Sequence, residues 1–203
     1  MPPDPHSNTT LHLAAAIAGD MSSLGWLVAH LSPLLLAQAR WRLGATLRSA
    51  CDPEDLVQDA WLVALPRLRD LMPRDGRTTP VLLRFLATTI VQRVNNLARD
   101  LLRRRGTGGA AAGHDPAAVT AAQTGVVTAA VRHELREALL VTIDSLDARD
   151  REVLLLRGVE QRSLQTTAEL LGVSTDAVSM RFARALARLR QHLPSALADD
   201  LAG

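Results

Sequence analysis

Two helices joined by a tight turn are predicted for Leu164–Leu193, LQTTAELLGVSTDAVSMRFARALARLRQHL. Gly172 permits the left-handed turn that ends the first helix, and Ser174 or Thr175 can cap the second. Four apolar residues of the second helix fall within about 60° of arc and predict its buried face: Val178, Phe182, Ala185 and Leu189. A short helix, a glycine turn and a second amphipathic helix are typical of a helix-turn-helix.

The other side of the second helix carries small and polar residues together with arginines. These residues are Thr175, Asp176, Ser179, Met180 and Arg184, with Arg181 and Arg188 at the flank. Side chains of this kind suit insertion into the major groove of DNA. A helical hairpin without a DNA-binding role is the alternative.

A longer amphipathic helix is predicted for Thr79–Arg105, TPVLLRFLATTIVQRVNNLARDLLRRR. Apolar residues fill one arc of about 120°, and Arg93 projects close to this arc without an assigned role. The opposite arc contains no acidic residue; its members are Arg84, Thr88, Gln92, Asn95, Arg99 and Arg103. An ordinary solvated face mixes charges of both signs, whereas Arg, Asn, Gln and Thr contact phosphates and base edges. The pattern therefore favours nucleic-acid binding.

A third helix is predicted for Asp52–Leu65, DPEDLVQDAWLVAL. Asp52 suits the N-cap, and Pro53 suits the first helical position. Beside the apolar face runs a second stripe at helical spacing, made of Asp55, Gln58, Asp59 and Leu62. The stripe is either a solvated face or a docking surface for a basic partner helix.

The composition excludes several classes of protein. Of the 203 residues, 47 % are hydrophobic and only 2 % aromatic, with no Tyr, which favours helices over a β-sandwich or barrel. The single cysteine excludes a disulfide framework, and the six histidines lack metal-ligand spacing, so we expect no enzyme, no cofactor and no metal. No basic residue precedes Arg40 and no apolar stretch is long enough to span a bilayer. A soluble, cytoplasmic protein without membrane insertion is expected.

The predicted fold is all-α, with two small helical domains joined by a flexible linker. A run rich in Gly and Ala, Gly106–Thr124, separates the helical segments. The expected divisions are a flexible N-terminal extension (residues 1–20), a first domain (21–105), a linker (106–130), a helix-turn-helix domain (131–193) and a tail (194–203). Such a linker would let the domains meet in the free protein, with the acid-rich Asp144–Glu152 as a candidate partner for the arginine-rich helix.

Three strings carry a resemblance to a known family: DPEDLVQDAWLVAL, DLLRRR, and IDSLDARDREVLLLRGVEQRSLQTTAELLGVSTDAVSMRFARALARLR at Ile143–Arg190. Together they resemble the sigma-70 family of bacterial RNA polymerase sigma factors, in its small extracytoplasmic-function (ECF) type. Thr167 stands where the family usually has an aliphatic residue, and Phe85 where a Trp is common.

This resemblance implies partners and site residues. Asp55, Gln58, Asp59 and Leu62 would bind core RNA polymerase. The acid-free arc from Arg84 to Arg103 would bind the −10 element of promoter DNA, and Thr175 to Arg188 the −35 element. A flipped non-template base would enter a pocket at the loop Met72–Thr79. An anti-sigma factor is a further candidate partner.

Two other functions remain open from the sequence. A helix-turn-helix activator that does not replace the sigma subunit would require a sensor or receiver domain at its N-terminus, and no such domain is apparent. A helical adaptor that does not bind DNA would explain the amphipathic helices, but not the acid-free arcs.

Overall fold

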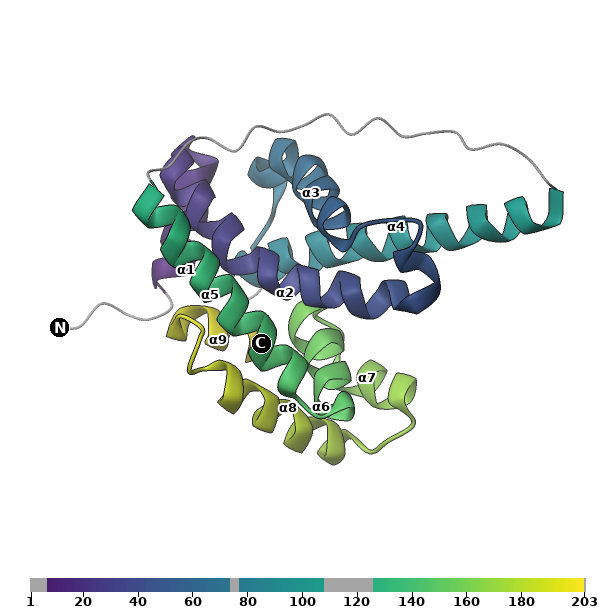
Figure 1. Cartoon of the computed structure of the whole chain (residues 1–203). Helices are drawn as coiled ribbons and strands as arrows, with labels where there is room; N and C mark the ends of the chain where they lie inside the picture. The colour runs from purple at the N-terminus through teal and green to yellow at the C-terminus, as the bar shows by residue number, and fades with distance from the viewer. Residues whose placement is uncertain (1–6, 74–76, 108–125, 203) are drawn as a thin grey trace.

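The computed structural model describes residues 7–73, 77–107 and 126–202, and these residues are almost entirely helical. Their elements are α1 (Ser7–Ile17), α2 (Met21–Arg48), α3 (Pro53–Ala64), the 3₁₀ helix η1 (Leu65–Asp70), α4 (Thr79–Thr107), α5 (Val126–Ser145), α6 (Ala148–Val153), the π-helix η2 (Leu154–Val159), α7 (Leu164–Leu171), α8 (Thr175–Leu189) and α9 (Ser195–Ala202). We call α1 to α4 the N-terminal module and α5 to α9 the C-terminal module (Figure 1). The predicted all-α class is confirmed.

Local sequence signals start the helices of the N-terminal module. The Asp52 carboxylate accepts a hydrogen bond from the Glu54 N–H, and Pro53 opens α3, as predicted. Asp20 caps α2 in the same way through the N–H groups of Ser22 and Ser23. These hydrogen bonds satisfy backbone donors that a helix start leaves without intrahelical partners.

The core of this module is formed by α2, α3 and α4, with α1 packed on α2. The face predicted for α3 is buried at Leu56, Val57, Ala60 and Trp61, and the Trp61 Nε1–H donates to the Ser32 hydroxyl at 3.0 Å. On α4 the predicted apolar arc is buried from Leu82 to Val94, and the later part of the helix projects away from the rest of the molecule (Figure 1).

An aromatic stack joins α1 to α2. The Trp26 ring lies between two imidazoles, with centroid distances of 4.3 Å to His12 and 4.0 Å to His30. The Nδ1 of His30 is also 2.8 Å from the Trp26 carbonyl oxygen. Burial lowers the pKa of His30, and the nearby His12 contributes in the same direction.

The C-terminal module contains the predicted helix-turn-helix. Gly172 ends α7 in the left-handed conformation, with φ 63°, and the Ser174 hydroxyl caps α8. Val178, Phe182, Ala185 and Leu189 are buried, as predicted. Thr167 is also fully buried, and its hydroxyl donates to the Ser163 carbonyl at 2.9 Å. The Thr at this position therefore has its hydrogen bond satisfied within the first helix of the motif.

Two segments predicted as a terminal extension and a tail contain helices. The predicted flexible extension contains helix α1, because Leu13 is only 1 % exposed and packs in the core. The predicted tail contains α9, whose Leu197, Ala198 and Leu201 are buried. Most of the predicted linker lies outside the described residues, while its last part, from Val126, belongs to α5.

The two modules pack on each other. Helix α5 crosses α2, and η2 also contacts α2 and α4 (Figure 1). Buried apolar residues of both modules belong to one cluster. Helices α4 and α8 are therefore parts of a single packed body.

Candidate functional site

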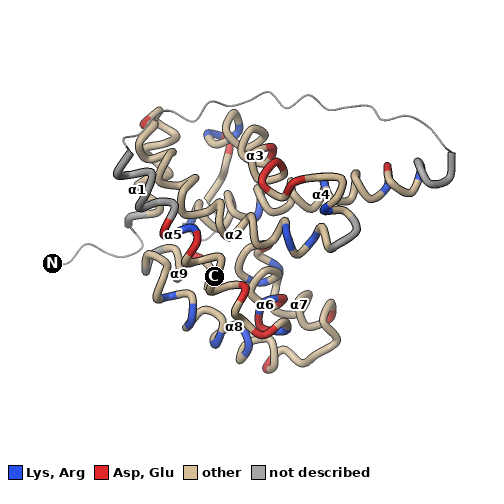
Figure 2. Tube along the Cα trace, viewed as in Figure 1, with Lys and Arg blue, Asp and Glu red and all other residues tan. Residues whose placement is uncertain are grey.

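Helix α8 presents the outward face that its spacing predicts. Asp176, Ser179, Met180, Arg184 and Arg188 are exposed, and Thr175 and Arg181 are half-buried. Met180, an apolar residue, is 64 % exposed. Figure 2 shows basic residues spaced along this helix. The exposed face thus combines small polar groups, one apolar side chain and several cations.

One arginine of this face, Arg184, is hydrogen-bonded to a carboxylate of the neighbouring helix α6. The Arg184 guanidinium donates two hydrogen bonds to the Asp150 carboxylate of α6, from Nη2 at 2.8 Å and from Nε at 3.2 Å. The hydrogen bond and charge of Asp150 raise the pKa of Arg184. Because this pairing uses one edge of the guanidinium, its other N–H groups remain directed elsewhere.

The acids of the stretch Asp144–Glu152 pair within the C-terminal module, and not with α4. Asp150 binds Arg184, Asp144 lies 3.9 Å from Arg151, and Asp147 caps α6. The predicted contact between Asp144–Glu152 and the arginine-rich helix is wrong, because these acids serve their own module.

Helix α4 exposes the whole acid-free arc, which comprises Arg84, Thr88, Gln92, Asn95, Arg99 and Arg103. The Arg99 Nη2 donates to the Asn96 side-chain oxygen at 2.7 Å, and Arg103 lies 3.5 Å from Asp100. These contacts are within the helix, so the arginines stay on the outer surface.

A cleft lies beside this arc, between the end of α3 and α4. It is lined by Val63, Arg67, Phe85, Thr88, Thr89, Gln92, Arg93 and Asn96. The Arg67 guanidinium lies 5.9 Å from the Phe85 ring centroid. Arg67 and Asn96 were not predicted from the sequence, because the cleft depends on how two helices cross. The loop expected to hold a flipped base, Met72–Thr79, lies partly outside the described residues.

On α3 the predicted polymerase-binding stripe is only partly exposed to solvent. Asp55 and Gln58 are exposed, whereas Asp59 and Leu62 are half-buried. Asp59 lies 3.5 Å from Arg93 of α4, so Arg93 has a structural partner at the edge of the apolar core. The free acidic surface of the stripe is concentrated at its first turn.

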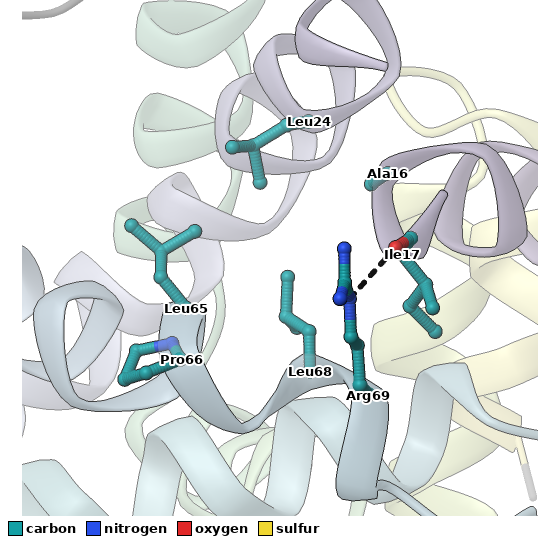
Figure 3. Close-up of a pocket in the computed structure, with 7 residues that line it drawn as sticks. All are labelled: Ala16, Ile17, Leu24, Leu65, Pro66, Leu68 and Arg69. Carbon is teal, nitrogen blue, oxygen red and sulfur yellow. Dashed lines mark hydrogen bonds between the residues drawn. The ribbon is translucent and has the colours of Figure 1, made fainter. Parts of the chain in front are cut away.

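A second cavity, between α1, α2 and η1, contains none of the predicted site residues. Figure 3 shows its apolar lining, closed on one side by the Arg69 side chain, whose Nε donates to the Ile17 carbonyl at 3.3 Å. No cluster of metal-ligating side chains occurs among residues 7–73, 77–107 and 126–202.

The chain is similar in sequence to known proteins along most of its length. The family model for sigma-70 region 4 matches residues 142–191, which include α6 to α8. The chain is 31 % identical to the ECF RNA polymerase sigma factor SigD of Mycobacterium tuberculosis and of Mycobacterium bovis. That alignment covers 91 % of this chain and 83 % of each relative.

This chain is an ECF sigma factor of the sigma-70 family. As such it directs promoter-specific transcription initiation, and an activator that leaves the sigma subunit in place is not favoured. A solved structure, CnrH in complex with the cytosolic domain of CnrY, is 26 % identical, with 91 % of this chain and 96 % of that chain covered and a TM-score of 0.38. Within the described part of this sigma factor, no helix is long and apolar enough to cross a membrane.

Proposed function

We propose that this sigma factor binds promoter DNA and core RNA polymerase through three separate surfaces. The −35 element is recognised by α8, the −10 element by α4, and the polymerase by the stripe on α3. The two DNA surfaces belong to different modules, α4 to the N-terminal module and α8 to the C-terminal module. The observation that carries this proposal is the exposed, cationic outer face of α8 above a buried helix-turn-helix core.

The chemistry of α8 fits the major groove. Arg184 can donate to a guanine edge or a phosphate, while Ser179 is small enough to allow close approach. The exposed Met180 offers an apolar contact of the kind that a thymine methyl group accepts. Thr175, Asp176, Arg181 and Arg188 complete the proposed −35 surface.

The chemistry of α4 fits a melted −10 element. Positive charge for the phosphate backbone of DNA comes from Arg84, Arg99 and Arg103. Hydrogen bonds to bases come from Thr88, Gln92 and Asn95. We assign the cleft with Phe85 and Arg67 as a surface on which an unpaired base stacks, because aromatic and guanidinium planes both accept a base face.

The stripe on α3 supplies the polymerase contact. Asp55 and Gln58 are open to solvent, and Leu62 adds an apolar patch one turn further along the helix. A basic helix of the core enzyme would pair with the acids and cover the leucine. An anti-sigma factor is a further proposed partner, and the cytoplasm is the proposed location.

Run-off transcription with purified core polymerase and a promoter library tests the whole proposal. We expect transcripts from promoters that share two elements, and their absence with every promoter would refute the function. For the polymerase surface, Asp55→Arg should abolish co-elution with core. Asp70→Arg, an exposed carboxylate in the same module outside the stripe, is the matched control and should co-elute normally.

A further inference from the structure

A cavity in the N-terminal module is used by none of the proposed DNA or polymerase contacts. It lies between the end of α1, the start of α2 and η1, and its volume is about 340 Å³ (Figure 3). Small-molecule sites in proteins have volumes from about 300 to 1,000 Å³ and are mostly apolar, with a few polar groups that orient the ligand. This cavity therefore has room for a small ligand.

The apolar side chains around this cavity are incompletely covered by the fold. Figure 3 shows Leu24 of α2 facing Leu65 and Leu68 of η1 across the hollow. Leu68 is only 4 % exposed, but Leu24, Leu65 and Ile17 are half-buried at the edge of the core. A ligand with an apolar body would remove this surface from water, and each methylene group that it buries would raise its affinity about fourfold.

One cation, Arg69, lies at the edge of the cavity. Its Nε donates to the Ile17 carbonyl at 3.3 Å, which fixes the guanidinium between η1 and the end of α1 (Figure 3). This bond leaves the two Nη groups to donate to another acceptor. Within the ranges that the structure describes, Arg69 forms no ion pair, and Asp20, the acid that follows α1, instead caps α2. The counter-charge of Arg69 is therefore one that a ligand can supply.

The donor geometry of this arginine favours a carboxylate. Two N–H groups on one edge of a guanidinium match the two oxygens of a carboxylate, and such charged, paired bonds are stronger than neutral ones. Arg69 is the only charged residue among the described residues that line the cavity. A single positive charge suits a monoanion, whereas an ammonium group would be repelled and an alcohol would lack the charge.

We propose that this cavity binds a small amphiphilic carboxylate, with its apolar body among Leu24, Leu65 and Leu68 and its carboxylate on Arg69. The ligand would contact α1, α2 and η1 at the same time. Because it binds only when these three segments are packed together, it should raise the melting temperature of the chain as its concentration increases. The inference does not depend on the assignment of α3, α4 and α8 to polymerase and promoter DNA.

Octanoate is the probe for this site. Isothermal titration calorimetry with the full-length protein should show one saturable site with a dissociation constant below about 1 mM. Hexanoate, which covers two fewer methylene groups, should bind about 10-fold more weakly. Octanol and octylammonium have the same chain length without the negative charge, and each should also bind about 10-fold more weakly than octanoate.

Variants of the lining assign the binding to this cavity. Ala16→Leu places a larger side chain in the cavity and should weaken octanoate binding about 10-fold, whereas Ala14→Leu, at an exposed position of the same helix, should not. Arg69→Gln should weaken octanoate binding about 10-fold and leave octanol binding unchanged. Arg48→Gln is its matched control and should bind octanoate normally, because Arg48 is another exposed arginine of this module that donates to a main-chain carbonyl, that of Arg40.

Three results would overturn the site. These are heat that rises without saturation, which indicates an adventitious additive only, equal binding of octanoate and octanol, and unchanged octanoate binding by folded Ala16→Leu. If circular dichroism shows that Ala16→Leu does not fold, Ala16→Val is measured by the same criteria. Run-off transcription without octanoate is a separate result, so failure of the cavity site and failure of the proposed function are distinguishable.

Discussion

Asp150 holds Arg184 with two hydrogen bonds across the interface between α6 and α8, so a residue outside the proposed DNA surface sets the direction of a side chain within it. Asp150 lies at the first turn of α6, and its side chain is only 13 % exposed, compared with 60 % for Arg184. The nearly buried carboxylate thus orients the exposed guanidinium.

Removal of this support should weaken DNA recognition more than folding. For Asp150→Ala we expect a loss of about 1 kcal/mol or less in the free energy of unfolding, since the pair is largely solvent-exposed on the arginine side. Discrimination between cognate and altered −35 duplexes should fall several-fold, because Arg184 loses its fixed orientation. Fluorescence anisotropy on both duplexes measures this ratio.

The control for this prediction is Asp144→Ala, which removes an exposed acid whose ion-pair partner is Arg151 of α6, at 3.9 Å. It should leave discrimination unchanged. An Asp150→Ala variant with unaltered discrimination would show that the ion pair only links two helices.

The turn of the helix-turn-helix depends on a left-handed residue. Gly172 has φ 63°, where a side chain with a Cβ is strained, although a Cβ at this position would meet no other atom within 4 Å. Gly172→Ala should therefore lower the free energy of unfolding by about 1 kcal/mol through backbone strain alone. Gly172→Asn should cost less, because Asn tolerates this conformation better. Urea denaturation of both variants measures the order, and equal costs would contradict it.

Stability should decline as the pH falls below about 6.5 because of His30. Burial lowers the pKa of this histidine in the folded state, so the unfolded chain takes up a proton first. The contribution of His30 is complete above the unfolded pKa of about 6.5 and is lost progressively below it, by at most about 1.4 kcal/mol per pH unit. In His30→Gln, the loss of unfolding free energy between pH 7 and pH 5 should be smaller than in the wild type.

The surroundings of His30 supply the controls. His12 and the Trp26 carbonyl face it, and the Asp20 carboxylate lies near His12. The pKa of Asp20 is lowered chiefly by its hydrogen bond from Ser23, so its own effect appears only below about pH 4. His192→Gln, in the other module, should retain the wild-type slope between pH 7 and pH 5; loss of the slope there would point to another group.

The arginines of α4 should contribute salt-dependent binding. Arg84→Ala should lower affinity for −10 fork DNA to a similar extent across sequences. It should also reduce the slope of log affinity against log salt by about 0.7 to 0.9 for each phosphate that the variant no longer neutralises. Arg69→Ala, whose guanidinium instead bonds to the Ile17 carbonyl, is the control. An unchanged slope for Arg84→Ala would remove this residue from the proposed −10 surface.

Periodicity predicted the helix faces because burial of a helix face follows directly from residue spacing. Leu82, Ile90, Val178 and Phe182 are all buried where their spacing places them. The packing of α1 and α9 was not predicted, since helices of 11 and 8 residues span too few turns for residue spacing to show which face is buried. Leu13 and Leu201 are buried only because neighbouring helices cover them.

The contact between the modules could not be predicted in the same way. Gln38 and Glu160 are 122 positions apart. A polar residue at a buried position carries no sequence signal for its partner. The cleft at Phe85 and the pairing of Asp59 with Arg93 depend likewise on how two helices cross, and not on the spacing within either one.

The three tryptophans of this chain all lie in the N-terminal module, at positions 26, 41 and 61. Trp41 carries the Arg42 guanidinium 4.6 Å from its ring centroid, and the same guanidinium binds Glu160 of the other module. Intrinsic emission from the protein therefore originates on one side of the interface, with one indole directly beside the contact between Arg42 and Glu160. Any change in this contact would therefore alter the fluorescence of Trp41, which can be followed in real time without a label.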